Sequence, residues 1–139
     1  MRYMGLDLGN RTVGISFSDP MGIVATGYET YRFNEKDLQK VLEYVKILVN
    51  EKNVDKIVLG LPKNMDGSEG ERTDVIRAFA ELLRKETDIP IDFYDERMTT
   101  MVAYRYLDGS GTYGKARRAA VDTLSAEIIL QSYIDKEKN

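Results

Sequence analysis

The sequence predicts a single α/β domain in which helices flank a mixed five-stranded sheet. Three strand-like segments joined by short turns open the chain and should form an antiparallel meander. After them, strand-like and helical patterns alternate, as they do where helices connect parallel strands. A chain of 139 residues is long enough for one domain with its own core. The sequence contains no repeat or linker, so we expect residues 1–139 to fold as one unit.

The first two strands form a predicted hairpin. Side chains from Tyr3 to Leu8 alternate between two faces, with apolar residues on one face and Asp7 on the other. Gly9 and Asn10 supply the turn because both tolerate positive φ. The β-branched residues of Thr12 to Phe17 continue as the second strand, and Ile23 to Tyr31 is the third.

Helices and strands then alternate along the chain. Asn34 is the expected N-cap of a helix that ends near Lys52 and Asn53. The later elements are a strand at Lys56–Leu61, a polar loop at Pro62–Gly70, a helix at Glu71–Thr87 and a strand at Pro90–Tyr94. A short helix capped by Thr99 or Thr100, a glycine-rich segment at Gly109–Gly114 and a helix at Lys115–Asp135 complete the chain. The last helix is apolar around most of its circumference, which predicts burial against the sheet.

The composition limits the chemistry available to the protein. The chain has no Cys and no His, which excludes disulfides, Ser-His-Asp triads and the usual zinc and haem ligands. A catalytic metal would therefore be a hard cation bound by oxygen. A net charge of −3 argues against a nucleic-acid binder that is basic over its whole surface, although it allows a local basic patch. No signal peptide or membrane-length apolar run occurs, so we expect a cytoplasmic protein that does not bind membranes.

Three carboxylates are placed where they could meet. Asp7 lies near the end of the first strand, Glu96 follows the fifth, and strand ends meet at one crevice of an open α/β sheet. Asp122 shares a helical stripe with Ala126, Ile129 and Tyr133, a mostly apolar face on which an acid needs a partner. The alternatives are that Asp7 only caps the turn and that Asp122 lies on a solvated face.

The three carboxylates together favour a metal site. Two carboxylates within ~4 Å repel by about 4 kcal/mol at an effective dielectric constant near 20, so a cluster needs a cation. Mg²⁺ or Mn²⁺ fits oxygen ligands, and two such ions ~3.5–4 Å apart can activate a water and stabilise the leaving oxygen of a phosphodiester. This chemistry requires neither His nor Cys.

Four motifs resemble one known family. They are Gly5-Leu-Asp-Leu-Gly-Asn-Arg-Thr-Val-Gly-Ile15, Gly60-Leu-Pro-Lys-Asn-Met-Asp-Gly-Ser-Glu-Gly70, Asp95-Glu-Arg-Met-Thr-Thr100 and Asp122-Thr-Leu-Ser-Ala126 with Ile128-Ile-Leu-Gln131. In this order and over nearly the whole chain, they resemble the YqgF/RuvX family, described as pre-16S rRNA nucleases and Holliday-junction-resolvase-like proteins. The resemblance implies an RNase H-like fold and implies that Asp7, Glu96 and Asp122 are the catalytic, metal-binding carboxylates.

Several polar and basic residues are candidates for binding substrate. Lys63, Asn64 and Ser68 lie in the loop after the central parallel strand, which should overhang the same crevice. The candidates for phosphate contacts are Arg11, Arg72, Arg97, Lys115, Arg117 and Arg118. Each of them could instead be an ordinary solvated charge, and Arg97 could instead form a structural ion pair.

Three functional hypotheses follow. The first is an Mg²⁺- or Mn²⁺-dependent nuclease for structured RNA in rRNA maturation, with branched DNA as the alternative substrate. It would bind precursor rRNA and ribosomal particles, and would act as a monomer or a homodimer. The second is a nucleotide-binding protein, because the Asp-x-Gly hairpin also resembles the phosphate-binding hairpin of actin-like ATPases. The third is a nucleic-acid or ribosome-associated factor without catalysis.

Overall fold

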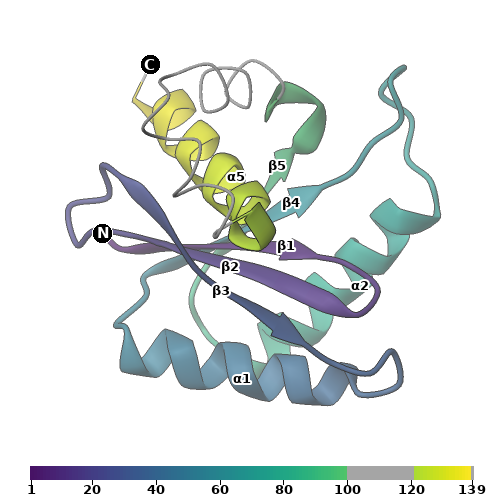
Figure 1. The fold of residues 1–139 in the computed structure, drawn as a ribbon, viewed down its shortest axis with the longest axis horizontal. Helices are drawn as coiled ribbons and strands as arrows, with labels where there is room; N and C mark the ends of the chain where they lie inside the picture. Colours follow the sequence, from purple (N-terminus) through teal and green to yellow (C-terminus); the bar gives the residue numbers. More distant parts are fainter. Residues whose placement is uncertain (100–120, 139) are drawn as a thin grey trace.

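The computed structural model describes residues 1–99 and 121–138 of the chain (Figure 1). Its elements are β1 (Tyr3–Leu8), β2 (Thr12–Ser18), β3 (Ala25–Arg32), α1 (Leu38–Glu51), β4 (Lys56–Leu61), α2 (Glu71–Glu86), β5 (Ile91–Asp95), the 3-10 helix η1 (Glu96–Thr99) and α5 (Val121–Glu137). The expected short helix after residue 99, the glycine-rich segment and the expected start of the last helix lie outside the described residues.

The five strands form one mixed sheet in the order β3-β2-β1-β4-β5. The β1–β2 and β2–β3 pairs are antiparallel, whereas β1–β4 and β4–β5 are parallel. The first strand of the chain is therefore the central strand of the sheet. This arrangement confirms the prediction of an antiparallel meander followed by parallel strands.

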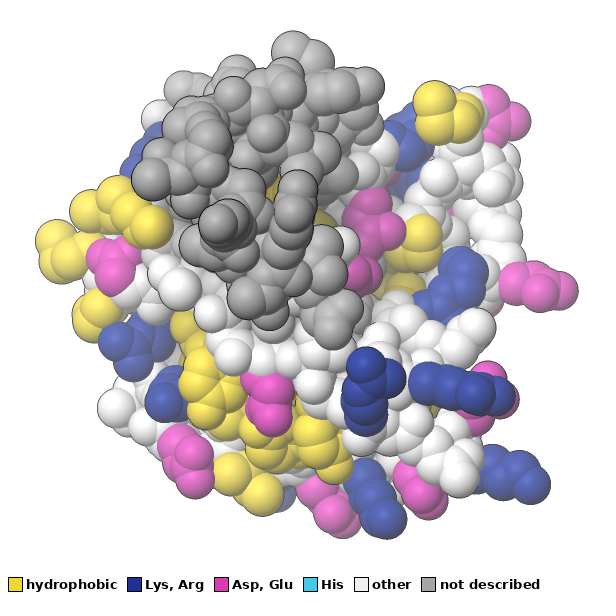
Figure 2. Space-filling view, in the orientation of Figure 1, with side chains coloured by type: hydrophobic (Ala, Val, Ile, Leu, Met, Phe, Trp, Pro, Cys, Tyr) yellow, Lys and Arg dark blue, Asp and Glu magenta, His cyan; other side chains and the backbone are white. Residues whose placement is uncertain are grey.

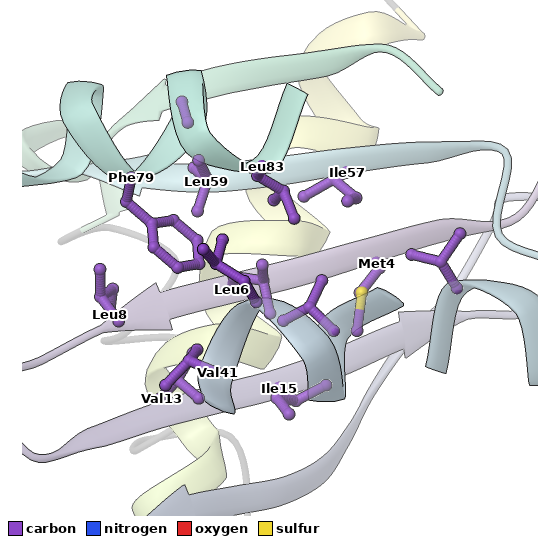
Figure 3. Close-up of a cluster of buried hydrophobic side chains, with 14 of the residues drawn as sticks. Met4, Leu6, Leu8, Val13, Ile15, Val41, Ile57, Leu59, Phe79 and Leu83 are labelled. Atoms are coloured by element: carbon purple, nitrogen blue, oxygen red, sulfur yellow. The ribbon is translucent and has the colours of Figure 1, made fainter. Parts of the chain in front are cut away.

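Helices cover both faces of the sheet, with α1 and α2 on one face and α5 on the other (Figure 1). The larger core lies on the α1/α2 face, where β1 contributes Met4, Leu6 and Leu8, as its alternating pattern predicts (Figure 3). Gly5 and Asp7 belong to the opposite face. The hydrophobic alternation of β1 therefore directs Asp7 to the side of the sheet that α5 covers.

Helix α5 approaches the sheet closely at Gly5. A Cβ atom on Gly5 would lie 2.4 Å from the Ser16 Oγ atom and 2.8 Å from the Leu130 Cβ atom. The Ser16 hydroxyl also donates a 2.8 Å hydrogen bond to the Ala126 carbonyl oxygen. Ala126 itself is fully buried, and most residues of the following two turns are buried, which confirms that the last helix is packed against the sheet.

Two side chains of α5 pair with the outer edge of β3. The Ala25 N–H donates to Gln131 Oε1 at 2.8 Å, and the Gly27 N–H donates to Glu127 Oε1 at 2.9 Å. An unpaired strand edge is a template for aggregation, and these side chains occupy part of it. Helix α5 is thus fixed across the sheet from β3 to β4.

The third strand begins two residues later than the sequence pattern predicts. The Asp19 carboxylate accepts hydrogen bonds from the backbone N–H groups of Met21, Ile23 and Val24 at 2.7–3.0 Å. These bonds also hold the pKa of Asp19 below its ordinary value, the largest contribution coming from Val24. Because Ile23 and Val24 use their donors in this turn, the expected start of the strand at Ile23 is wrong and β3 begins at Ala25.

The predicted cap of α1 is also wrong, whereas its end is confirmed. Asn34 accepts a hydrogen bond from the Asp37 N–H at its carbonyl oxygen and so forms a turn before the helix. The N-cap position falls on Asp37, whose side chain makes no capping bond. At the other end, Asn53 adopts φ 52°, a left-handed conformation that stops a helix.

Within residues 1–99 and 121–138, no helix is both long enough and apolar enough to span a bilayer.

The close approach at Gly5 gives a test of the fold. We predict that Gly5→Ala lowers the free energy of unfolding by about 1–3 kcal/mol, because the new methyl group overpacks the contact between β1 and α5. Urea denaturation would measure the change. The control is Gly70→Ala, where the nearest atom to the new Cβ lies at 3.9 Å. Equal stability of the two variants would contradict the packing described here.

Candidate active site

Asp7 lies near the carboxyl end of the central strand. Its neighbour in the antiparallel register is Gly14 on β2, which carries no side chain. On the parallel side, the β1–β4 register reaches Leu6 and Leu59, so the next residue of β4 beside Asp7 is Gly60. Asp7 therefore stands between two glycines on the α5 face of the sheet, with room for a second group above them.

Glu96 supplies that second group. It is the first residue of η1, directly after β5, and its side chain reaches back over Gly60. A Cβ atom on Gly60 would lie 2.6 Å from Glu96 Oε1. The absence of a side chain at Gly60 is therefore what allows the carboxylate of Glu96 to approach Asp7.

The two carboxylates open into one pocket at the end of the parallel strands. Its volume is about 270 Å³, and its lining residues are Asp7, Leu8, Gly9, Asn10, Pro62, Arg72 and Glu96. This is the crevice beyond the strand ends at which α/β sheets bind ligands. The prediction that Asp7 and Glu96 converge agrees with this geometry, and Pro62 shows that the loop after β4 begins at the same pocket.

The proximity of the two acids changes the ionisation of Glu96. Burial, the negative charge of Asp7 and a hydrogen bond with the Asp7 carboxylate, in decreasing order of size, together raise the pKa of Glu96 from 4.5 to about 7. Arg72 acts in the opposite direction and lowers the pKa of Glu96. The carboxyl group of Glu96 therefore holds its proton more tightly than an exposed glutamate does, as expected for an acid that is buried beside another acid.

Arg72 connects this pocket to helix α2. It lies in the first turn of α2, and its guanidinium donates to the Leu8 carbonyl oxygen and, at 2.9 Å, to Asn10 Oδ1. These bonds hold the hairpin turn after β1 beside the amino end of the helix. The same positive charge also lies close enough to Glu96 to affect its pKa. Arg72 is therefore both a structural tie and the basic group of the pocket.

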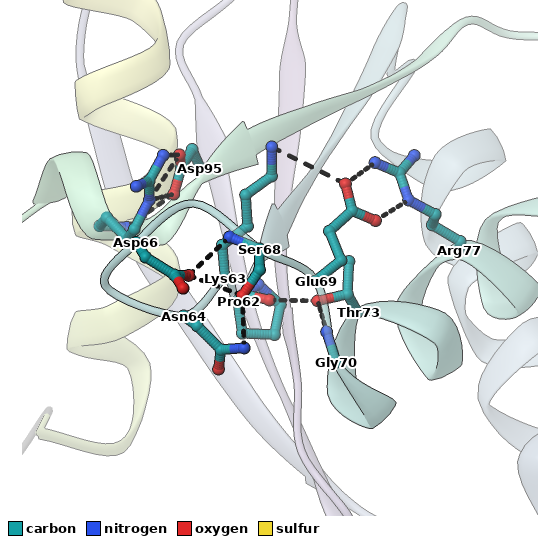
Figure 4. A network of polar contacts seen from close by, with 11 residues as sticks. Pro62, Lys63, Asn64, Asp66, Ser68, Glu69, Gly70, Thr73, Arg77 and Asp95 are labelled. Atoms are coloured by element: carbon teal, nitrogen blue, oxygen red, sulfur yellow. Dashed lines mark hydrogen bonds and ion pairs between the residues drawn. The ribbon is translucent and has the colours of Figure 1, made fainter.

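The loop from Pro62 to Gly70 is held by its own polar contacts (Figure 4). The Asn64 amide donates to Ser68 Oγ at 3.0 Å, and the Ser68 hydroxyl donates to Asp66 Oδ1 at 2.6 Å. Lys63 pairs with Glu69 at 3.8 Å, while Arg77 binds the same carboxylate through two 2.8 Å bonds. The three predicted substrate-binding residues of the loop therefore also define its shape.

Arg97 forms an ion pair with Asp95. This ion pair is the alternative to the predicted phosphate contact of Arg97. Its guanidinium binds the Asp95 carboxylate, with a shortest distance of 2.6 Å, and donates to the Met65 carbonyl oxygen at 3.3 Å. This hydrogen-bonded pair lowers the pKa of Asp95. Of the two neighbouring acids after β5, Asp95 is thus neutralised by Arg97, whereas Glu96 faces Asp7.

The other predicted residues fall in three places. Arg11 lies at the tip of the β1–β2 hairpin, where its exposed side chain is 3.7 Å from Glu35. Asp122 lies in the first described turn of α5, but its side chain is not among those described. Lys115, Arg117 and Arg118 lie outside the described residues. Among the described side chains, no group of three acids is close enough to hold a metal ion.

Sequence reasoning missed the role of Gly60 and the contacts of Arg72 with the hairpin turn. The signal for Gly60 was present, because a glycine inside an apolar strand marks a close approach of another group. No local pattern indicates that Arg72 reaches the carbonyl oxygen of Leu8, since the two residues are 64 positions apart.

The sheet order and the acid pair at its centre define a class, the RNase H-like α/β proteins of the resolvase type. The structure is similar to that of Thermus thermophilus RuvC in complex with a Holliday junction substrate, with a TM-score of 0.65 over 99% of this chain and 96% of that one. The two sequences are 9% identical, so this likeness concerns the fold. The family model described as "RuvX: Holliday junction resolvase" matches residues 1–136. The chain belongs to this family.

Curated relatives cover almost the whole chain. A protein of Leuconostoc mesenteroides named "Putative pre-16S rRNA nuclease" is 45% identical over 138 residues, which are 99% of this chain and 96% of that protein. A Listeria monocytogenes protein of the same name is 44% identical over 135 residues, 97% of this chain and 98% of that protein. The resemblance found in the four motifs is confirmed.

The raised pKa of Glu96 predicts a pH-dependent stability. Because Glu96 binds its proton more tightly in the folded protein, its favourable contribution is complete below about pH 4.5 and is lost as the pH rises through 7. Glu96→Gln mimics the protonated form. In metal-free buffer, the gain in melting temperature of Glu96→Gln over the unsubstituted protein should therefore grow from pH 5 to pH 8.

The control is Glu43→Gln, on the exposed surface of α1. Its difference from the unsubstituted protein should not follow the pattern of Glu96→Gln. A melting-temperature gain for Glu96→Gln that is the same at both pH values would contradict the raised pKa of Glu96 in the folded protein.

Proposed function

We propose that this chain is a metal-dependent nuclease that hydrolyses phosphodiester bonds in structured nucleic acid and matures the 5′ end of pre-16S rRNA. The observation that carries the proposal is the meeting of Asp7 and Glu96 in one pocket at the end of the central strand. Membership of the RuvX family and the names of the relatives support the reaction class and the substrate.

Mg²⁺ or Mn²⁺ fits the residues of this pocket. The carboxylates of Asp7 and Glu96 offer oxygen ligands, and a divalent cation between them would offset the repulsion that raises the pKa of Glu96. When bound, the cation supplies Lewis-acid activation of the phosphodiester and of the water that attacks it.

We assign the third ligand to Asp122. Its backbone lies one helical turn before Ala126, whose carbonyl oxygen is 3.1 Å from the position of a Cβ on Gly5. Gly5 precedes Asp7 by two residues on the same face of β1, because side chains alternate along a strand. The amino end of α5 therefore supports a place for Asp122 near the acid pair.

The remaining groups of the pocket bind and orient the substrate in this proposal. Arg72 offers the guanidinium beside Glu96 as a counter-charge for the phosphate. Lys63, Asn64 and Ser68 contact the strand that passes over the loop after β4, and Arg97 fixes that loop through its bond to Met65. We assign further phosphate contacts to Lys115, Arg117 and Arg118. Hydrolysis forms a bond from the water oxygen to phosphorus and breaks the bond to the leaving ribose oxygen.

Branched DNA is the second candidate substrate, favoured by the likeness of the fold to RuvC in complex with a Holliday junction. A non-catalytic role is less well supported, because Asp7, Glu96 and Asp122 are all present. The nucleotide-binding alternative has no support from the family match. We further propose that the enzyme works in the cytoplasm on ribosomal particles, as a monomer or a homodimer.

The proposal predicts that Asp7→Asn abolishes cleavage and leaves the fold intact. Removing one charged ligand should lower the rate by about 10³-fold. The measurement is a nuclease assay on precursor rRNA and on four-way DNA junctions, with Mg²⁺, with Mn²⁺ and with excess EDTA. Circular dichroism would monitor the fold. The matched control is Asp88→Asn, an exposed aspartate between α2 and β5, which should cleave as the unsubstituted protein does.

Either of two results would rule the mechanism out. One is full activity of Asp7→Asn, and the other is undiminished cleavage in excess EDTA. The ratio of the rates on rRNA and on the DNA junction decides between the two substrates.

A further inference from the structure

A second hollow, distinct from the pocket of Asp7 and Glu96 (the acid pocket), lies at the hairpin tip and the end of β3. It has a volume of about 520 Å³ and is lined by Arg11, Arg32, Phe33, Asn34 and Glu35. We refer to these five residues as the arginine groove. Asn10 lines the acid pocket and its neighbour Arg11 lines the groove, so both hollows border the same hairpin turn.

The strand register places Arg32 on the same face of the sheet as Asp7. Asp7 is paired with Gly14, and Gly14 with Thr30. Because side chains alternate along a strand, Arg32 shares the face of Thr30 and hence that of Asp7. The spacings of strands and residues put the Cα atoms of Arg32 and Asp7 about 12 Å apart. A nucleic-acid strand bound at Asp7 could therefore continue to Arg32.

The two arginines of the groove are available to a ligand. The Arg11 side chain is 80% exposed, and its 3.7 Å contact with the 58% exposed Glu35 is a weak surface ion pair. Arg32 is exposed and forms no ion pair with another residue of the described ranges. Several Lys and Arg side chains lie on the side of the molecule where the hairpin tip and the end of β3 lie, with Asp and Glu side chains among them (Figure 2).

Phe33 adds an aromatic wall to the groove. Its ring is half-buried and packs on one side against the core of the α1/α2 face, so the groove passes around the end of β3 from the face of Arg32 to that of Phe33. Arginines that follow the backbone, together with an aromatic ring that stacks on a base, are the features by which proteins bind single strands. A base inside a duplex is stacked on its neighbours and cannot present its face to such a ring.

We propose that the arginine groove binds the single-stranded nucleotides that flank the bond cleaved at Asp7 and Glu96. Arg11 and Arg32 contact consecutive phosphates, and a base lies against Phe33. The inference rests on the proposed nuclease function and specifies its substrate class, a structured nucleic acid with an unpaired segment beside the cleavage point. Glu35 opposes this binding, because its charge competes with the phosphate for Arg11.

Fluorescence anisotropy with all variants in an Asp7→Asn background tests the groove without cleavage. The probes are an oligouridylate of about 12 nucleotides, an oligothymidylate and a blunt RNA duplex of equal length. Replacing both Arg11 and Arg32 with Ala should weaken binding of the single strands about tenfold and lower the salt slope by about 1.4, the value for two phosphate contacts. Glu35→Gln should strengthen binding. Replacing both Lys46 and Lys85 with Ala, on the surfaces of α1 and α2, removes the same charge elsewhere and is the control.

Each outcome has a defined meaning. Equal losses for the two single strands support backbone contacts, and a loss confined to the oligouridylate supports contacts that include the ribose 2′-OH. The groove is disproved if the double arginine variant binds like the control, or if its loss is as large for the duplex. Failure of the groove leaves cleavage by the unsubstituted protein intact. Failure of the nuclease proposal leaves these binding constants interpretable, so the two are distinguishable.

Discussion

The repulsion between Asp7 and Glu96 is the constraint to which the surrounding structure is adapted. Parallel pairing of β1, β4 and β5 brings both strand ends to one edge of the sheet, and Gly60 leaves the space into which Glu96 reaches. Burial and the charge of Asp7 raise the pKa of Glu96 to about 7, and the positive charge of Arg72 offsets part of this effect. A fold that required only stability would not place two acids together in this way.

Glycine residues leave space around the acid pair, and arginine residues bind the backbone and the acid next to it. Gly5 admits α5 against the sheet, so that the helix which carries Asp122 crosses the central strand. Arg97 neutralises Asp95 and holds the loop after β4, whereas Arg72 joins the hairpin turn to α2. The two acids that are next to each other in the sequence therefore have different surroundings, because Asp95 binds Arg97 whereas Glu96 faces Asp7.

The sequence was sufficient to predict the elements whose signal is periodic. Alternation in β1 and the continuous apolar run of β4 predicted both strands with their correct bounds, and the apolar circumference of α5 predicted its burial. The errors concern side chains that bond to nearby backbone. Asp19 delays β3, and Asn34 forms a turn where a cap was expected. The proximity of Asp7 to Glu96 could be predicted from the strand-end rule, but the contact of Arg72 with Leu8 depends on tertiary structure alone.

The central claim is that Asp7 and Glu96 together bind a divalent cation. Calorimetric titration of Mn²⁺ into the protein at pH 7 tests it most directly, with Asp7→Asn, Glu96→Gln and Asp95→Asn as variants. The first two should each weaken Mn²⁺ binding by at least about tenfold, as loss of a metal-supporting group does. Asp95→Asn should bind like the unsubstituted protein, because Asp95 is engaged by Arg97. Unchanged affinity in Asp7→Asn and Glu96→Gln would contradict the account.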